Sequence, residues 1–69
     1  MVKETIKKLE EMLNKVTDQH GSIEIINEIS GFEVYYQTKE GYIISIGIGE
    51  TLKDAIMELI KNVIFIFSK

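Results

Sequence analysis

Hydrophobic residues in the last third of the chain recur at steps of three and four, the period of an α-helix. They are Leu52, Ala55, Ile56, Leu59, Ile60, Val63, Ile64 and Phe67. Thr51 stands directly before this run and is a residue type that caps helix N-termini. The pattern predicts a core helix that begins after Thr51. Its end is open: the helix either continues to Phe67 or unwinds, so that residues 63–67 fold back as an extended tail.

A second amphipathic pattern begins the chain, from Val2 to about Val16. Its apolar stripe consists of Val2, Ile6, Leu9, Met12, Leu13 and Val16, and the remaining positions are rich in Lys and Glu. This indicates a helix with one buried face and one solvated face. Gly21 follows, and we expect it to adopt the left-handed conformation that often ends a helix.

Three segments between the helices have the composition of β-strands. The first, from Ser22 to Ile29, is rich in isoleucine, but its alternation breaks at Ile25 and Ile26, which indicates either a bulge or partial cover on both faces. The second, Phe32 to Gln37, alternates cleanly. The third, Tyr42 to Ile48, follows a short Gly-ended connection of the kind that closes a hairpin with a bulge.

The side chains of the last two strands divide between two faces of a sheet. Phe32, Val34 and Tyr36 are expected on one face of the second strand, and Ile44, Ile46 and Ile48 on one face of the third. Tyr35 and Ile43 should then face away from both helices, and Ile26 could be their neighbour.

These elements predict a small α+β protein. The order is α-β-β-β-α, and short connections favour a three-stranded antiparallel sheet with two helices packed on one face. The 69 residues suit a single domain, 1–69, and the sequence has no proline, repeat or linker that would divide it. It also has no cysteine and one histidine, so packing alone must stabilise it, with help from an oligomer interface.

The charge pattern argues against nucleic acid and membranes as partners. The formal net charge is −3, and lysines and acids are interspersed. The N-terminus lacks the pattern of a signal peptide, and the most apolar run, 63–67, is too short to cross a bilayer. A chain without cysteine also agrees with a reducing compartment. We therefore expect a soluble, cytoplasmic protein.

No catalytic constellation is evident. His20 has no designated nucleophile or acid beside it, and a loop histidine next to a glycine is typically an exposed helix-end residue. Gly47-x-Gly49 lacks the third glycine of a dinucleotide fingerprint and the Gly-Lys-Ser/Thr of a phosphate loop. We expect no enzyme, no metal and no cofactor.

The chain resembles the double-stranded RNA-binding domain between Phe32 and Leu59. Phe32-x-Val34-x-Tyr36 is similar to that family's second strand, and Gly47-x-Gly49-x-Thr51-x-Lys53-x-Ala55 resembles its Gly-x-Gly-x-Ser-Lys-Lys-x-Ala-Lys entry into the last helix. The resemblance implies the same α-β-β-β-α fold and, as an alternative function, binding of duplex RNA.

The lysines that grip phosphate in that family are mostly replaced in this chain. Leu52 and Ile56 stand at two of the lysine positions, so Lys53 is the candidate RNA contact, and Glu50 and Asp54 flank it. Because phosphate contacts supply much of the affinity for nucleic acid, we expect RNA binding to be largely lost.

A second resemblance is to HicB-type antitoxins, small cytosolic proteins whose three-stranded sheet leads into a helix through Gly-x-Thr-Leu-x-x-Ala. Residues 49–55, Gly-Glu-Thr-Leu-Lys-Asp-Ala, are similar to that segment, within a match that spans Phe32 to Ile64. This resemblance implies a role as an antitoxin component. A capped amphipathic helix after a strand produces the same letters, so both readings stay open.

Hydrophobic residues remain that the predicted core does not need, and they form the candidate protein interface. Tyr35 and Ile43 are expected on the uncovered sheet face, and the last helix adds four more: Met57, Ile64, Phe65 and Phe67. Such surplus commonly marks an association surface. We expect a non-catalytic interaction module, a small regulatory or inhibitory protein of a microbe or mobile element. It would bind a protein partner or form a homodimer.

Overall fold

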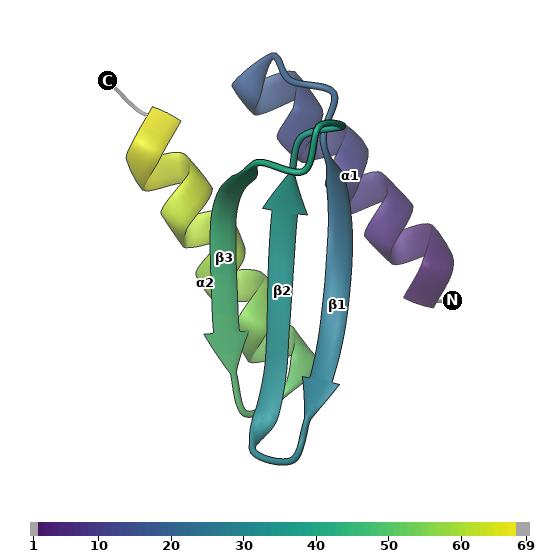
Figure 1. Ribbon diagram of the computed structural model, residues 1–69, viewed down its shortest axis with the longest axis vertical. Coiled ribbons are helices and arrows are strands. Elements are labelled where there is room, and N and C mark those ends of the chain that lie inside the picture. Colours follow the sequence, from purple (N-terminus) through teal and green to yellow (C-terminus); the bar gives the residue numbers. More distant parts are fainter. Residues whose placement is uncertain (1, 68–69) are drawn as a thin grey trace.

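The computed structural model describes residues 2–67, and in it two helices and three strands follow the predicted order. Helix α1 spans Val2–Thr17, and helix α2 spans Leu52–Phe67. Strands β1 (Ser22–Glu28), β2 (Gly31–Gln37) and β3 (Ile43–Gly49) form one antiparallel sheet in the order β1-β2-β3 (Figure 1). The predicted α+β class and three-stranded sheet are confirmed, and α2 stays helical to Phe67.

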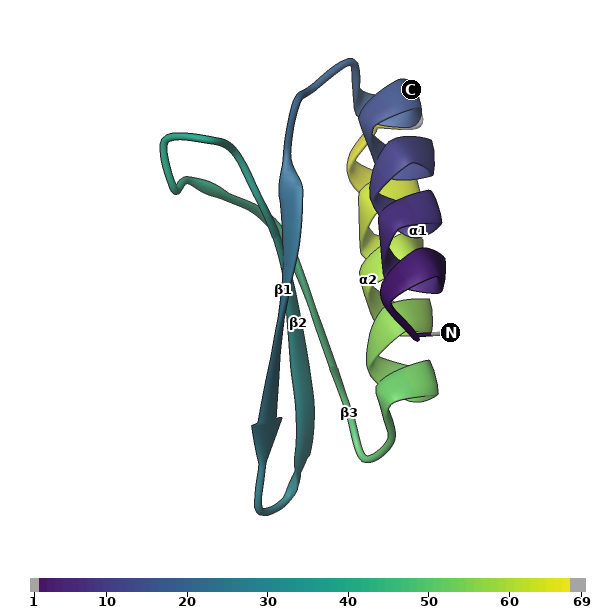
Figure 2. The same cartoon turned by 90° about the vertical axis from the view of Figure 1, so that its right-hand side faces the viewer.

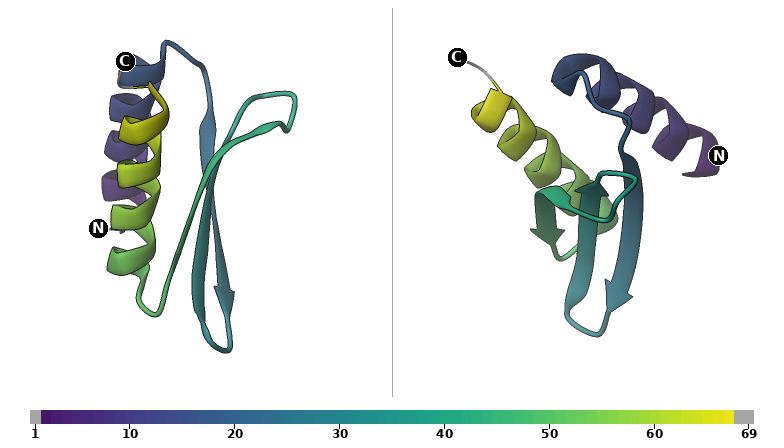
Figure 3. Two further views of the ribbon diagram at one scale, coloured as in Figure 1. Left: turned by 90° about the vertical axis from the view of Figure 1, so that its left-hand side faces the viewer. Right: turned by 45° about the horizontal axis from the view of Figure 1, so that its top comes forward.

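The two helices form a single layer on one face of the sheet. Figures 2 and 3 show α1 and α2 side by side, with the strands on one side of both. The opposite face of the sheet is uncovered and is called the open face below. The loop of residues 38–42 between β2 and β3 bends away from the helices.

Strand β1 contains no bulge. It pairs with β2 in an unbroken register, in which Ile25 lies opposite Val34 and Ile26 lies opposite Glu33. Because Val34 is fully buried, Ile25 faces the helices and Ile26 lies on the open face. Of the two explanations for the broken alternation, the bulge is therefore wrong: two adjacent isoleucines simply occupy opposite faces.

Strand β3 turns a different face to the helices from the one expected. Ser45 and Gly47 lie opposite the buried Tyr36 and Val34, so they point inward, whereas Ile46 lies opposite Tyr35 on the open face. Ile48 shares that face. The predicted grouping of Ile44, Ile46 and Ile48 is wrong, and only Ile44 packs against the core. The pairing of β2 with β3 shifts after Tyr36, because Tyr36 lies opposite Ser45 and Gln37 lies opposite Ile43. Ile44 is therefore the extra, unpaired residue of the irregularity expected near this hairpin.

Close contact between the α2 backbone and β3 explains this reversal. A Cβ atom on Gly47 would overlap the Ala55 carbonyl oxygen and lie 2.6 Å from the Leu59 amide nitrogen. A Cβ on Gly49 would lie 2.6 Å from the Ala55 amide nitrogen. An isoleucine cannot fit at either place, so the glycines face the helix and the isoleucines face outward.

The core lies between the helices and β2. Its buried side chains are Leu9, Leu13, Val34, Tyr36, Ala55, Leu59 and Val63. The phenol of Tyr36 is completely buried, and it donates a hydrogen bond to Asn14 Oδ1 (2.5 Å) and lies 2.9 Å from Thr17 Oγ1. These bonds satisfy the one polar atom of a large buried side chain and fasten the end of α1 to the sheet.

Helix α1 ends at Thr17, and the left-handed residue that follows it is Asp18 and not Gly21. Asp18 adopts the left-handed conformation (φ 58°), and the Gln19 amide donates to the Asn14 carbonyl at 3.3 Å, the bond of a Schellman motif. The prediction for Gly21 is therefore wrong. This glycine is required for space, because a Cβ there would lie 2.7 Å from Tyr36 Cε1.

We predict that Gly47→Ala destabilises the protein by about 3 kcal/mol, because the added methyl group must push α2 away from β3. Urea unfolding followed by circular dichroism measures this change. Gly41→Ala is the control: no atom lies within 4 Å of its Cβ, so it introduces only the strain of φ 94°, about 1 kcal/mol. Equal losses in the two variants would contradict the close contact.

Candidate functional site

The six residues predicted as an interface do not form one surface. Tyr35 and Ile43 both lie on the open face, as expected. Met57 and Ile64 are more than half exposed and lie on another side of α2, where they line a shallow depression with Ile60. The other two, Phe65 and Phe67, belong to the last turns of the same helix. The structure therefore brings together Ile43 with Phe65 and Met57 with Ile64, on two different surfaces.

Phe65 lies beside strand β3, in what we call the β3–α2 groove. Ile43, Ile44, Ser45 and Ile46 line this shallow groove from the strand, and Asn62, Phe65 and Ile66 line it from the helix. The Phe65 side chain is 83 % exposed, and no lining residue is charged. A largely exposed phenylalanine in an uncharged groove is a feature of protein contact surfaces.

Two polar side chains of the β3–α2 groove differ in their hydrogen bonding. The Asn62 side-chain amide donates to the Ile46 carbonyl oxygen at 2.9 Å, so part of the outer edge of β3 is already occupied. The Ser45 hydroxyl is buried and has no hydrogen-bond partner among the described residues. A buried hydroxyl without a partner costs about 1–3 kcal/mol of folding stability.

The open face combines apolar and acidic side chains in neighbouring rows. The register places Glu24, Tyr35 and Ile46 in one row, and Ile26, Glu33 and Ile48 in the next. Glu28 adds a third carboxylate at the end of β1. The three strands contain no Lys, Arg or His.

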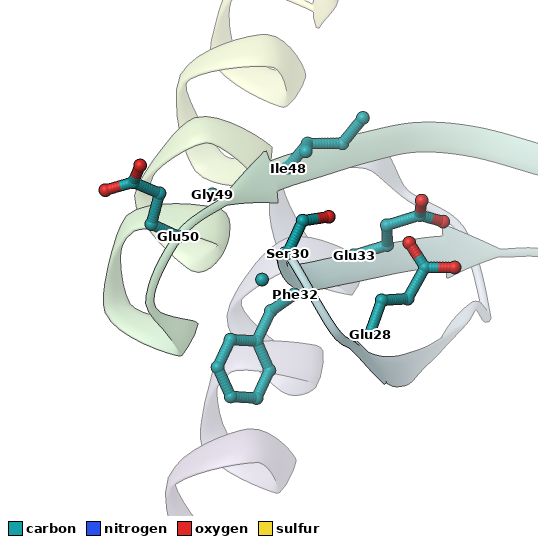
Figure 4. Close-up of a pocket in the computed structure, with 8 residues that line it drawn as sticks. Glu28, Ser30, Phe32, Glu33, Ile48, Gly49 and Glu50 are labelled. Carbon is teal, nitrogen blue, oxygen red and sulfur yellow. The ribbon is translucent and has the colours of Figure 1, made fainter.

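The carboxylates of the open face repel one another. Hydrogen bonding to Glu33 and the negative charge of Glu33 raise the pKa of Glu28 above its usual value of 4.5. The Tyr35 hydroxyl donates to Glu33 Oε1 at 2.5 Å, and this bond, with the negative charges of Glu33, Glu28 and Glu24, raises the pKa of the phenol. Figure 4 shows the carboxylates of Glu28 and Glu33 close together, with Phe32 on the other side of the sheet. Such crowding of like charges is unfavourable for the folded state of the isolated chain.

The residues considered for nucleic-acid binding or catalysis are exposed. Lys53 lies in the first turn of α2, where the Asp54 amide donates to the capping Thr51 hydroxyl at 3.1 Å. His20 is exposed in the connection between α1 and β1. Within residues 2–67 no three His, Cys, Asp or Glu side chains are arranged to hold a metal ion. No helix in this part of the chain has the length and apolar character needed to cross a membrane.

Sequence reasoning missed the outward orientation of Ile46 and Ile48 and the exposure of Ile66. The signal for the first two was present, because the glycines at 47 and 49 alternate with them and mark the face that another backbone approaches. Their assignment to the core followed hydrophobicity alone. No comparable signal marks Ile66, since its exposure depends on how far α2 extends beyond the sheet.

We predict that Glu28→Gln raises the melting temperature at pH 7. A raised folded-state pKa means that the ionised carboxylate opposes folding, so the stability of the wild type falls as pH rises above about 4.5. The charge that acts on Glu28 is that of Glu33, and Glu50 lines the same pocket from the segment before α2. The gain should disappear below about pH 4, where the carboxyl groups are protonated.

Thermal unfolding followed by circular dichroism from pH 3 to 8 tests this prediction. Glu40→Gln, in the exposed loop of residues 38–42, removes one charge from another part of the surface and is the control. A gain of the same size in both variants would mean that net charge, and not the contact with Glu33, is responsible.

Comparisons with known proteins identify no relative of this chain. No family model, curated protein or solved structure matches the chain. The resemblances to the double-stranded RNA-binding domain and to HicB-type antitoxins therefore stay predictions from the sequence, and the functional argument rests on the surfaces described above.

Proposed function

We propose that this protein is a non-catalytic interaction module that forms a homodimer through the β3–α2 groove. The observation that carries the proposal is the 83 % exposure of Phe65 in an uncharged groove. Burying a phenylalanine side chain contributes about 2 kcal/mol, and a two-fold interface buries two of them. A small domain without disulfides or metal gains stability from such an association.

Charge favours a second copy of the chain as the occupant of the groove. The protein has a net charge of −3, so two copies repel one another wherever their acidic surfaces meet. The residues that line the β3–α2 groove carry no charge, so this surface can face its own copy without that penalty. A contact between two open faces would instead place glutamates against glutamates.

Side-chain packing, and not strand addition, is the proposed mode of contact. The Asn62 amide already occupies the Ile46 carbonyl at the edge of β3, which opposes continuous pairing with a strand of another molecule. Phe65 would instead insert between Ile43 and Ile66 of the second copy. The dimer would leave Ile26, Ile48 and the carboxylates of the open face exposed to a further partner, which suits a small regulatory or inhibitory protein.

We predict that Phe65→Ser converts a dimer into a monomer, because it removes the largest exposed apolar side chain of the groove. Light scattering after size exclusion, over a dilution series, measures the molar mass. Met57→Ser is the matched control, since Met57 is 57 % exposed on a different side of α2, and it should leave the dimer intact.

A wild-type protein that is monomeric at every concentration would refute self-association. A dimer that is lost equally in both variants would place the contact elsewhere on α2. Circular dichroism of each variant verifies that the fold is retained, as expected for substitutions of exposed side chains.

A further inference from the structure

The open face carries a second surface that self-association leaves unused. Both helices cover the opposite side of the sheet, and two isoleucines outside the β3–α2 groove remain exposed on this one: Ile48 is 65 % exposed and Ile26 is 37 % (Figure 2). A sheet normally buries its apolar faces against another layer of secondary structure. This layer is missing from the described part of the chain.

The acidic side chains determine what chemistry can form that layer. Glu24, Glu28 and Glu33 lie among the isoleucines, without any Lys, Arg or His on the three strands. A second copy of this face, a nucleic acid or an anionic lipid surface would add negative charge to negative charge. A cationic partner would relieve the repulsion between neighbouring carboxylates.

We propose that the open face docks a basic amphipathic helix of another protein. The apolar stripe of such a helix would cover Ile26 and Ile48, and its Lys or Arg residues would reach the neighbouring carboxylates. A helix fits better than an added strand, because the exposed isoleucine and glutamate side chains belong to the face of the sheet, whereas an added strand would pair with the backbone at its edge. This surface adjoins the β3–α2 groove at Ile43 and Ile46, but its carboxylates lie on β1 and β2, outside the groove, so the inference does not depend on dimer formation.

The geometry of the two rows supports this occupant. Residues of neighbouring strands that lie opposite one another are about 5 Å apart, close to the spacing of side chains one helical turn apart. Each row also contains one glutamate and at least one isoleucine, in Glu24–Tyr35–Ile46 and Ile26–Glu33–Ile48. A helix with lysine and leucine at neighbouring positions of one side can therefore contact a glutamate and an isoleucine of the same row.

Binding of a synthetic peptide of about 18 residues, built from Leu and Lys in an amphipathic helical pattern, tests the inference. The affinity of the full-length protein is measured by calorimetry for the wild type and for a triple variant, Glu24→Gln with Glu28→Gln and Glu33→Gln. The matched control is Glu4→Gln with Glu11→Gln and Glu58→Gln, which removes three exposed charges from the helices.

We expect the sheet variant to bind the peptide about tenfold more weakly and the control to change by less than about twofold. Amide chemical shifts should change at Ile26, Tyr35 and Ile48 in the wild type. Equal weakening of both variants, or shift changes confined to the helices, would overturn the inference. Ile48→Ser is a second variant that keeps every charge and should also weaken binding.

The molar mass distinguishes this site from the proposed dimer contact. If the sheet variant keeps the wild-type mass but loses peptide binding, only the open face is affected. If Phe65→Ser changes the mass but binds the peptide as the wild type does, the two surfaces act independently. A Phe65→Ser protein that no longer binds the peptide would contradict this separation.

Discussion

The close contact between α2 and β3 is the constraint on which the rest of the structure depends. Gly47 and Gly49 bring the helix backbone so near to the strand that no side chain fits between them. Ala55, Leu59 and Val63 are fully buried as a result, which supplies most of the α2 contribution to the core. The isoleucines that alternate with these glycines have no place beneath the helix and must lie on the open face.

This constraint therefore also creates the surfaces on which the proposed function rests. Because Ile46 and Ile48 face outward, the uncovered side of a three-stranded sheet becomes apolar, and the neighbouring carboxylates make it acidic as well. The same close packing holds the end of α2 beside β3, where Phe65 and Ile43 form an uncharged groove. The two surfaces differ in charge, so they suit different partners: a second copy of the chain in the groove, and a basic helix on the open face.

The order of elements could be predicted from the sequence because period and composition agree along most of the chain. Two helical stripes and three β-branched segments separated by glycine leave little choice of architecture. The orientation of β3 could not be derived in the same way. Hydrophobicity favours burial of Ile46 and Ile48. Their orientation is set instead by the short distance between the backbones of α2 and β3, and the spacing of the glycines is the sequence signal for that distance.

The candidate interface was predictable as a set of residues but not as surfaces. Phe65 was recognisable as an exposed apolar residue because it falls among polar positions of the α2 pattern. Its neighbours in the groove come from β3, and their grouping depends on the irregular pairing around Ile44, which has no clear signature in the sequence. Likewise, Glu24 and Glu33 meet on the open face only through the register of β1 and β2.

Intermolecular nuclear Overhauser effects in a mixture of isotope-labelled and unlabelled protein test the central claim, self-association through the β3–α2 groove, most directly. The account predicts contacts between the Phe65 ring of one molecule and the Ile43 or Ile66 methyl groups of the other. Intermolecular contacts confined to Ile26 and Ile48 of the open face, or to Met57 and Ile64, would contradict it.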